Sequence, residues 1–170
     1  MSVLERFGLP NATWVETGTY FGETTAHLAV AARQVFSIEP DRDFAANAEE
    51  KFAKTHNVQI LHGLSEELLP GILTAISGPI CFWLDGHFSG PGTFQGPVDT
   101  PIELELQHIE SLIASGREVV VFVDDVRLFG EINQYPSGEI YPHRSLLVNW
   151  ADRNGMTWTI EHDIFIAWPR

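Results

Sequence analysis

Two glycines and two acids in the first quarter of the chain could together bind a nucleoside. Residues 16–24 read ETGTYFGET, at the point where a predicted strand ends and a helix begins. Gly18 would let the chain turn sharply, and Gly22 would let the backbone and the start of the helix approach a ligand closely. Glu39 ends the next predicted strand, seventeen residues after Gly22. Its carboxylate could accept hydrogen bonds from both hydroxyls of a ribose.

This segment also has simpler explanations. The glycines could serve only a tight turn, and Glu39 could be a solvated strand end. A dinucleotide-binding fingerprint would need glycine at Tyr20 and Glu23, so the G-x-G-x-x-G pattern is not met. The sequence contains no Walker lysine and no G-x-S-x-G nucleophile elbow.

Three further acids follow two apolar runs that we predict to be strands. Asp85 ends the run 80–85, and Asp124 and Asp125 end the run 119–124. Because the carboxyl ends of parallel strands face one crevice, we expect these side chains to converge. Three close carboxylates repel one another unless they are protonated or neutralised, and their oxygens suit Mg²⁺, Mn²⁺ or Ca²⁺ better than zinc. The alternative is that they only cap strand ends.

The elements that would position these groups alternate regularly between strand and helix. The expected parallel strands are residues 12–16, 35–39, 58–61, 80–85 and 119–124. The expected helices are residues 23–34, a segment from the N-cap Asp41 through Phe52, one capped by Ser65, one opened by a capping box of Thr100 and Glu103, and residues 144–152. Residues 156–161 and 164–168 form a closing hairpin. The pattern predicts a single α/β domain over residues 1–170, doubly wound, with a seven-stranded, mostly parallel sheet and a C-terminal antiparallel hairpin.

Composition excludes several classes of function. The chain has 10 Lys+Arg against 23 Asp+Glu, a formal net charge of −13. It therefore lacks the basic surface that nucleic acids or anionic membranes require. The lone Cys81 cannot form an intrachain disulfide, the first residues lack the apolar core of a signal peptide, and no apolar run approaches the roughly 20 residues of a spanning helix. We expect a cytoplasmic protein.

The glycine turn, the acid at Glu39 and the closing hairpin resemble class I S-adenosylmethionine-dependent methyltransferases. Their first motif is an acid-x-Gly-x-x-x-Gly turn, followed by an acid at the tip of the second strand, and the resemblance covers about residues 13–168. It implies that the chain has the Rossmann-like methyltransferase fold and uses S-adenosyl-L-methionine as cofactor. Glu39 would bind the ribose hydroxyls, and Leu64 and Ser65 would flank the adenine, near which many members carry an acid. The other cofactor contacts that the resemblance implies are Glu16, Gly18, Thr19, Tyr20, Gly22, Thr24 and Asp85.

The three aspartates also resemble the metal site of O-methyltransferases similar to macrocin O-methyltransferase. In that group, an Asp after the fourth strand and an Asp-Asp pair after the fifth hold Mg²⁺, which binds vicinal hydroxyls and lowers the pKa of one of them. The resemblance implies that Asp85, Asp124 and Asp125 bind Mg²⁺ or another divalent cation. The base that follows the first metal ligand by two residues is Asp in that group and His87 here. An imidazole could take the proton, so His87 and Asp85 are the catalytic candidates, although His87 could also be an ordinary loop histidine.

Together these features predict an enzyme that methylates a hydroxyl group of a small molecule, such as a sugar or another diol. Residues 87–97 and 127–141 would form the substrate wall. We expect a pocket that is either open or completed by a second subunit in a homodimer, with residues 135–141 and Trp150 as the contact surface. Trp150 could instead pack on the sheet. The alternatives are a metal-independent methyltransferase that relies on Asp85 or His87, a non-catalytic domain that binds S-adenosylmethionine, and a metal-dependent hydrolase that uses the three aspartates.

Overall fold

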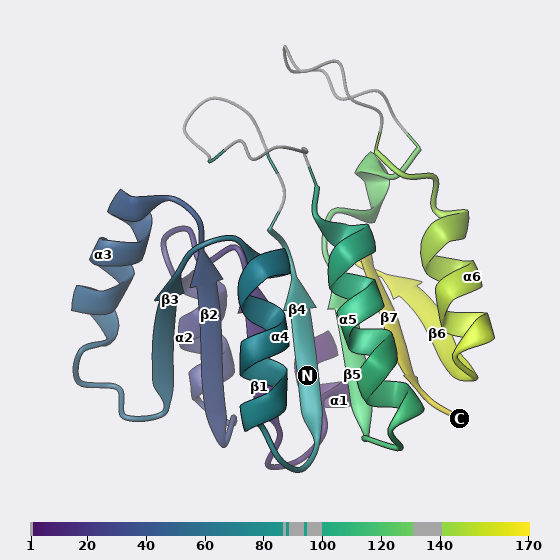
Figure 1. The fold of residues 1–170 in the computed structure, drawn as a ribbon, viewed down its shortest axis with the longest axis horizontal. Helices are drawn as coiled ribbons and strands as arrows, with labels where there is room; N and C mark the ends of the chain where they lie inside the picture. Colours follow the sequence, from purple (N-terminus) through teal and green to yellow (C-terminus); the bar gives the residue numbers. More distant parts are fainter. Residues whose placement is uncertain (1, 87, 89–93, 95–99, 131–140) are drawn as a thin grey trace.

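The computed structural model of the chain describes residues 2–86, 88, 94, 100–130 and 141–170 (Figure 1). The strands are β1 (Thr13–Thr17), β2 (Gln34–Glu39), β3 (Val58–His62), β4 (Ile80–Leu84), β5 (Val119–Val123), β6 (Met156–Glu161) and β7 (Ile164–Pro169). The helices are α1 (Val3–Phe7), α2 (Glu23–Ala29), α3 (Arg42–Phe52), α4 (Ser65–Ala75), α5 (Ile102–Ala114), the short 3₁₀ helix η1 (Val126–Leu128) and α6 (Ser145–Arg153).

The seven strands form one sheet in the order β3-β2-β1-β4-β5-β7-β6. The first five strands are parallel, and β7 runs antiparallel to both β5 and β6. The predicted doubly wound sheet with a C-terminal antiparallel hairpin is therefore confirmed. The chain moves from β1 outward to β2 and β3 and then returns to β4 on the other side of β1. The carboxyl ends of β1 and β4 thus meet at a topological switch point, which is where ligands bind in open α/β sheets.

Each face of the sheet has its own apolar core. Val15, Phe82 and Val121 lie on the face that α4, α5 and α6 cover, while Trp14 and Phe122 lie on the face that α1 and α2 cover. Figure 1 shows α4, α5 and α6 in front of the sheet and α1 and α2 behind it. Strands β1, β4 and β5 are buried along their whole length, as the continuous apolar runs of β4 and β5 predict for central parallel strands.

Three predicted helix starts or ends are wrong. Helix α2 ends at Ala29 rather than at residue 34, because the amide of Arg33 already donates to Ala12 O, at 2.9 Å, beside the start of β1. Helix α5 begins at Ile102 with Pro101, and not Thr100, as its N-cap. The Thr100 hydroxyl accepts a hydrogen bond from the amide of Ile102 at 3.4 Å, but it does not form the predicted capping box with Glu103. Ser65 is the first residue of α4 and not its cap, because its hydroxyl donates to the buried Glu105 instead.

The closing hairpin makes the tight turn that was predicted between its strands. Glu161 pairs with Ile164, and the two residues between them, His162 and Asp163, have φ angles of +51° and +69°. Two positive φ angles are typical of a type I′ turn, whose twist matches that of the flanking strands. In the part of the chain that the structure describes, no helix has the length and apolar character needed to cross a membrane.

Candidate functional site

Gly18 occupies the narrowest point of the switch region. Its φ angle is +84°, and a Cβ atom built on it would lie 2.6 Å from the carbonyl oxygen of Asp85. Its amide donates to the carbonyl of Ile38 at 2.9 Å. The turn after β1 therefore runs directly between the ends of β2 and β4, where only glycine satisfies both the backbone angle and the space.

The rest of the turn is held in an unusual conformation. Gly22 is the N-cap of α2 with φ +71°, and an added Cβ would lie 2.7 Å from the ring of Phe52. Tyr20 has φ +47°, a conformation that is strained for a residue with a side chain. The hydroxyl groups of Thr19 and Ser37 are 2.6 Å apart and tie the turn to β2. Strain at a glycine-rich turn on a switch point is typical of a ligand-binding loop.

Glu39 at the end of β2 is bound to this turn. Its Oε2 accepts a hydrogen bond from the amide of Tyr20 at 2.8 Å, and its Oε1 accepts one from the amide of Asp41 at 2.9 Å. The side chain is buried, which raises its pKa, while the backbone amides of Tyr20, Asp41 and Thr19 act in the opposite direction. A carboxylate has about four acceptor positions, so two backbone bonds leave capacity for the two hydroxyls of a ribose. The strained Tyr20 thus fixes the orientation of the acid.

Glu16 lies beneath the turn and is fully buried in β1. Its Oε2 accepts hydrogen bonds from the hydroxyls of Thr25 and Ser37, both at 2.5 Å. Its Oε1 has no hydrogen-bond partner among the described residues, and the same is true of the indole nitrogen of Trp83, the residue opposite Glu16 on β4. Burial raises the pKa of Glu16 to about 7, and the charges of Asp85 and Glu39 contribute in the same direction. Oε1 of Glu16 and the indole nitrogen of Trp83 are therefore buried polar atoms without a partner among the described residues.

Replacing Glu16 with glutamine should change how stability depends on pH. The folded-state pKa of about 7 lies above the ordinary 4.5, so the folded chain binds this proton more tightly than the unfolded chain. The resulting stabilisation is complete below the unfolded pKa and is lost as the pH rises through 7. We expect the unfolding free energy of the wild type to fall by about 2 to 3 kcal/mol relative to Glu16→Gln between pH 5 and pH 8. Urea denaturation at both pH values measures this difference, and equal changes in the two proteins would contradict it.

Ser65 and Glu105 form a buried contact between α4 and α5. The Ser65 hydroxyl donates to Oε1 of Glu105 at 2.6 Å, and the side chain of Glu105 is 1% exposed. Leu64, the N-cap of α4, is half-buried. Glu105 was not predicted, although it sits at position i+3 of the apolar stripe Ile102, Leu106, Ile109. A charged residue inside an apolar stripe is the sequence signal that could have indicated a buried acid at Glu105.

Removing the Ser65 hydroxyl should destabilise the protein. Ser65→Ala deprives the buried Glu105 carboxylate of a donor, and we expect the unfolding free energy to fall by about 1–3 kcal/mol. Ser111→Ala, at an exposed position of α5, the helix that carries Glu105, is the control and should change stability little. Urea denaturation compares the two, and an equally small effect at Ser65 would show that the contact contributes nothing.

The ends of β4 and β5 bring Asp85 and Asp124 to adjacent positions. Leu84 and Val123 are paired in register, and the amide of Asp124 donates to Leu84 O at 3.1 Å. A small pocket lies beside these ends and above α5. Its polar lining consists of Thr100, Glu105, Asp124, Asp125 and Tyr141. The structure thus places the backbones of Asp85 and Asp124 side by side at this edge of the sheet, and the convergence of their carboxylates stays a prediction.

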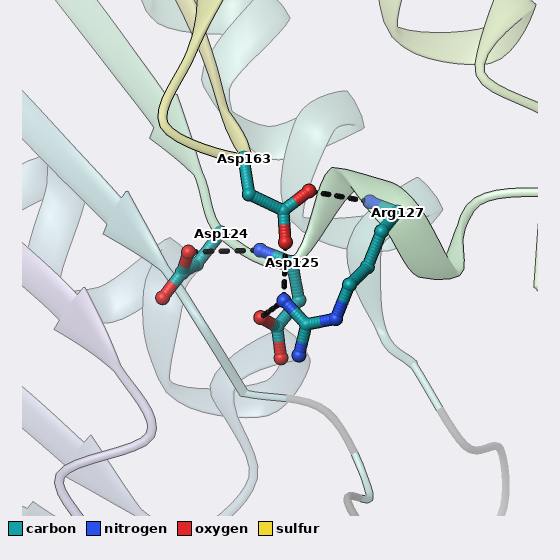
Figure 2. Close-up of polar contacts among 4 residues, drawn as sticks. All are labelled: Asp124, Asp125, Arg127 and Asp163. Carbon is teal, nitrogen blue, oxygen red and sulfur yellow. Dashed lines mark hydrogen bonds and ion pairs between the residues drawn. The ribbon is translucent and has the colours of Figure 1, made fainter.

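The predicted Mg²⁺ site is not supported. The described residues contain no group of three or more His, Cys, Asp or Glu side chains that could hold a metal ion. The reason is visible in Figure 2, where the carboxylate of Asp125 turns toward the guanidinium of Arg127, with which it forms an ion pair. Oδ1 of Asp124 accepts a hydrogen bond from the amide of Asp125 at 2.8 Å. Asp125 thus has a cationic partner from the protein itself.

Several predicted residues lie outside the described part of the chain or have another role. His87, most of the loop 87–97 and residues 131–140 are outside it. Trp150 is fully buried and its indole nitrogen donates to Leu106 O at 3.3 Å, so it packs in the core and is not part of a contact surface. Tyr141 is also buried, and its hydroxyl donates to Phe88 O at 3.2 Å.

The sheet order and the closing antiparallel hairpin form a Rossmann-like fold, which solved structures of methyltransferases share. No protein-family model matches the sequence, and no curated protein matches it.

Solved structures of other proteins do match this chain. An O-methyltransferase from Bacillus cereus, solved with S-adenosylhomocysteine, is 17% identical, with 91% of this chain and 72% of that chain covered and a TM-score of 0.59. An S-adenosylmethionine-dependent methyltransferase from Aquifex aeolicus is 18% identical, with 98% and 86% covered and a TM-score of 0.55. An rRNA methylase from Streptococcus thermophilus is 12% identical, with 95% and 90% covered and a TM-score of 0.51. At these identities the likeness establishes the fold.

Proposed function

We propose that the chain binds S-adenosylmethionine and methylates a hydroxyl group of a small molecule. The observation that carries this proposal is the buried Glu39, held at the tip of β2 by the amide of the strained Tyr20. This arrangement presents a fixed pair of acceptors to a ribose diol beside a turn that comes close to any ligand at the switch point. A plain tight turn would need neither the buried acid nor the strained residue.

The charges around the turn fit the same ligand. Glu16, Glu39 and Asp85 are close enough that Asp85 and Glu39 both raise the pKa of Glu16. Such a group of acids favours a cation, and S-adenosylmethionine carries a positive sulfonium and an α-ammonium group. When bound, S-adenosylmethionine supplies an electrophilic methyl group. Glu16 contributes its negative charge from a buried position beneath the turn.

The acceptor would bind where β4 and β5 end. Asp85 is half-buried there, and its amide donates to Thr17 O at 3.0 Å, which fixes the acid next to the glycine turn. We assign to Asp85 the task of orienting the acceptor hydroxyl and taking its proton, with Asp124 as a second acceptor for a neighbouring hydroxyl. Methyl transfer is an in-line displacement, so alignment of the two reactants by these residues supplies much of the rate. His87 remains the other candidate for the base.

The charge of the chain supports a small acceptor over RNA. Three of the similar structures are named as rRNA methylases or methyltransferases, but this chain carries a formal net charge of −13. Binding to RNA depends on neutralising phosphates with Lys and Arg, and a strongly acidic surface opposes it. Neutral diols and sugars carry no such requirement, and the carboxylates of Asp85 and Asp124 can accept hydrogen bonds from them.

Transfer of a labelled methyl group from S-adenosylmethionine tests the proposal. The acceptors are a panel of sugars, catechol-type diols and simple alcohols, with an rRNA fragment as a separate arm. We expect transfer to a hydroxyl compound, with a rate that falls about 100-fold or more in Asp85→Asn. Asp43→Asn, at an exposed position of α3, is the matched control and should keep the full rate. Cofactor binding without transfer to any acceptor would favour a non-catalytic domain, and transfer to the RNA alone would overturn the acceptor class.

A further inference from the structure

Arg127 connects two acidic residues, Asp125 and Asp163, at the acceptor edge of the sheet. Its guanidinium forms ion pairs with Asp125, two residues earlier, and with Asp163 in the turn between β6 and β7 (Figure 2). Its backbone amide also donates to Oδ1 of Asp163 at 2.8 Å. The hairpin turn is bonded once more to this segment, because the amide of Val126 donates to Asp163 O at 3.0 Å. One arginine thus holds the end of β5 against the C-terminal hairpin.

The backbone around Arg127 is shaped for this arrangement. Asp125 and Asp163 both have positive φ angles, +54° and +69°, which non-glycine residues adopt rarely and at a cost in energy. In this conformation the amide of Asp125 donates to Oδ1 of Asp124 at 2.8 Å, so the position of Asp125 also orients Asp124 in the acceptor pocket. Hydrogen bonding to Asp163, with the charges of both acids, raises the pKa of Arg127. The guanidinium of Arg127 therefore stays positively charged between Asp125 and Asp163.

We infer that Arg127 is a built-in cation that takes the place of a divalent metal at the end of β5 and, through Asp125, positions Asp124 in the acceptor pocket. The metal-dependent arrangement expected from the sequence needs the oxygens of Asp125 as ligands. Here those oxygens face a guanidinium, and a divalent ion bound to them would lie a few ångströms from a positive charge. Repulsion at such a distance opposes binding, and solvent screens it in part because the Arg127 side chain is 62% exposed. The inference concerns the site of the proposed methyl transfer, which would then need no added metal.

Binding of Mn²⁺, followed by the loss of the electron paramagnetic resonance signal of the free ion, tests this without any turnover. We expect wild-type protein to bind Mn²⁺ only weakly, in the millimolar range. Arg127→Ala removes the internal cation and leaves Asp124, Asp125 and Asp163 together, so we expect binding to become at least about tenfold tighter. The gain should disappear in the double variant Arg127→Ala with Asp125→Asn. Arg127→Lys keeps the charge and should bind as weakly as the wild type.

Two results would overturn the inference. One is tight Mn²⁺ binding by the wild type that is lost in Asp124→Asn. This experiment leaves Arg127 in place, so its outcome does not depend on whether the Arg127→Ala protein folds. The other is an Arg127→Ala protein that melts cooperatively by circular dichroism but binds Mn²⁺ no better than the wild type. A gain of Mn²⁺ binding in a protein that does not bind S-adenosylhomocysteine would support this inference while refuting the proposed function.

Discussion

Glu39→Gln is expected to weaken the binding of S-adenosylhomocysteine by about 10- to 100-fold. Glutamine has nearly the same shape but replaces one carboxylate oxygen with an NH₂ group, which cannot accept a hydrogen bond from the amide of Tyr20 or Asp41. It also removes the charge that strengthens each hydrogen bond to a ribose hydroxyl, and such charge-assisted bonds contribute about 1.5–3 kcal/mol each. Isothermal titration calorimetry measures the change directly.

The control for Glu39 is Glu49→Gln on α3. Glu49 is exposed, so this variant makes the same change of charge away from the glycine turn. Its affinity for S-adenosylhomocysteine should equal that of the wild type. If both variants bind as the wild type does, Glu39 is a structural acid that only fastens Tyr20, and the ribose must be bound elsewhere.

Gly18→Ala should have the second large effect, on binding and on stability together. The methyl group would lie 2.6 Å from Asp85 O, and the backbone would have to keep φ +84° with a side chain present. The strain costs about 1–3 kcal/mol, and relieving the clash would separate the ends of β1 and β4. We expect a lower unfolding free energy by urea denaturation and affinity for S-adenosylhomocysteine reduced by at least about tenfold.

Gly116→Ala separates the effect of backbone strain from the effect of the steric clash. Gly116 has φ +81°, close to the value at Gly18, but an added Cβ meets nothing within 4 Å. It follows α5 and precedes β5, at the end of the sheet away from the glycine turn. This variant should lose stability through backbone strain alone and should bind S-adenosylhomocysteine normally. Normal binding by Gly18→Ala as well would mean that the turn after β1 does not contact the ligand.

The fold and the glycine turn at its switch point follow from local patterns in the sequence. Alternating apolar runs and helical segments predict the sheet and its closing hairpin, because parallel strands need crossover helices. Parallel strands also explain why acids that end separate runs meet at one edge, as Asp85 and Asp124 do. Gly18 was identified from its place after a predicted strand, and its φ angle and lack of space give the reason.

The remaining features depend on contacts between segments that are distant in the sequence. Arg127 meets Asp163 only because the β6–β7 hairpin returns to β5, and no local pattern around the Asp124–Asp125 pair indicates this partner. The predicted Ser65 cap is not formed for a similar reason. Glu105, forty residues away, takes the Ser65 hydroxyl that a local pattern would assign to the helix terminus. Tertiary contacts determine the use of these polar side chains.

Calorimetric titration of S-adenosylhomocysteine into the wild-type chain tests the central claim most directly. The buried Glu39, the turn at Gly18 and the acids beneath it predict binding of one ligand per chain with a dissociation constant in the micromolar range, with or without Mg²⁺. Absence of binding under both conditions would contradict the assignment of this turn to S-adenosylmethionine. The chain would then share the fold of the methyltransferases without their cofactor.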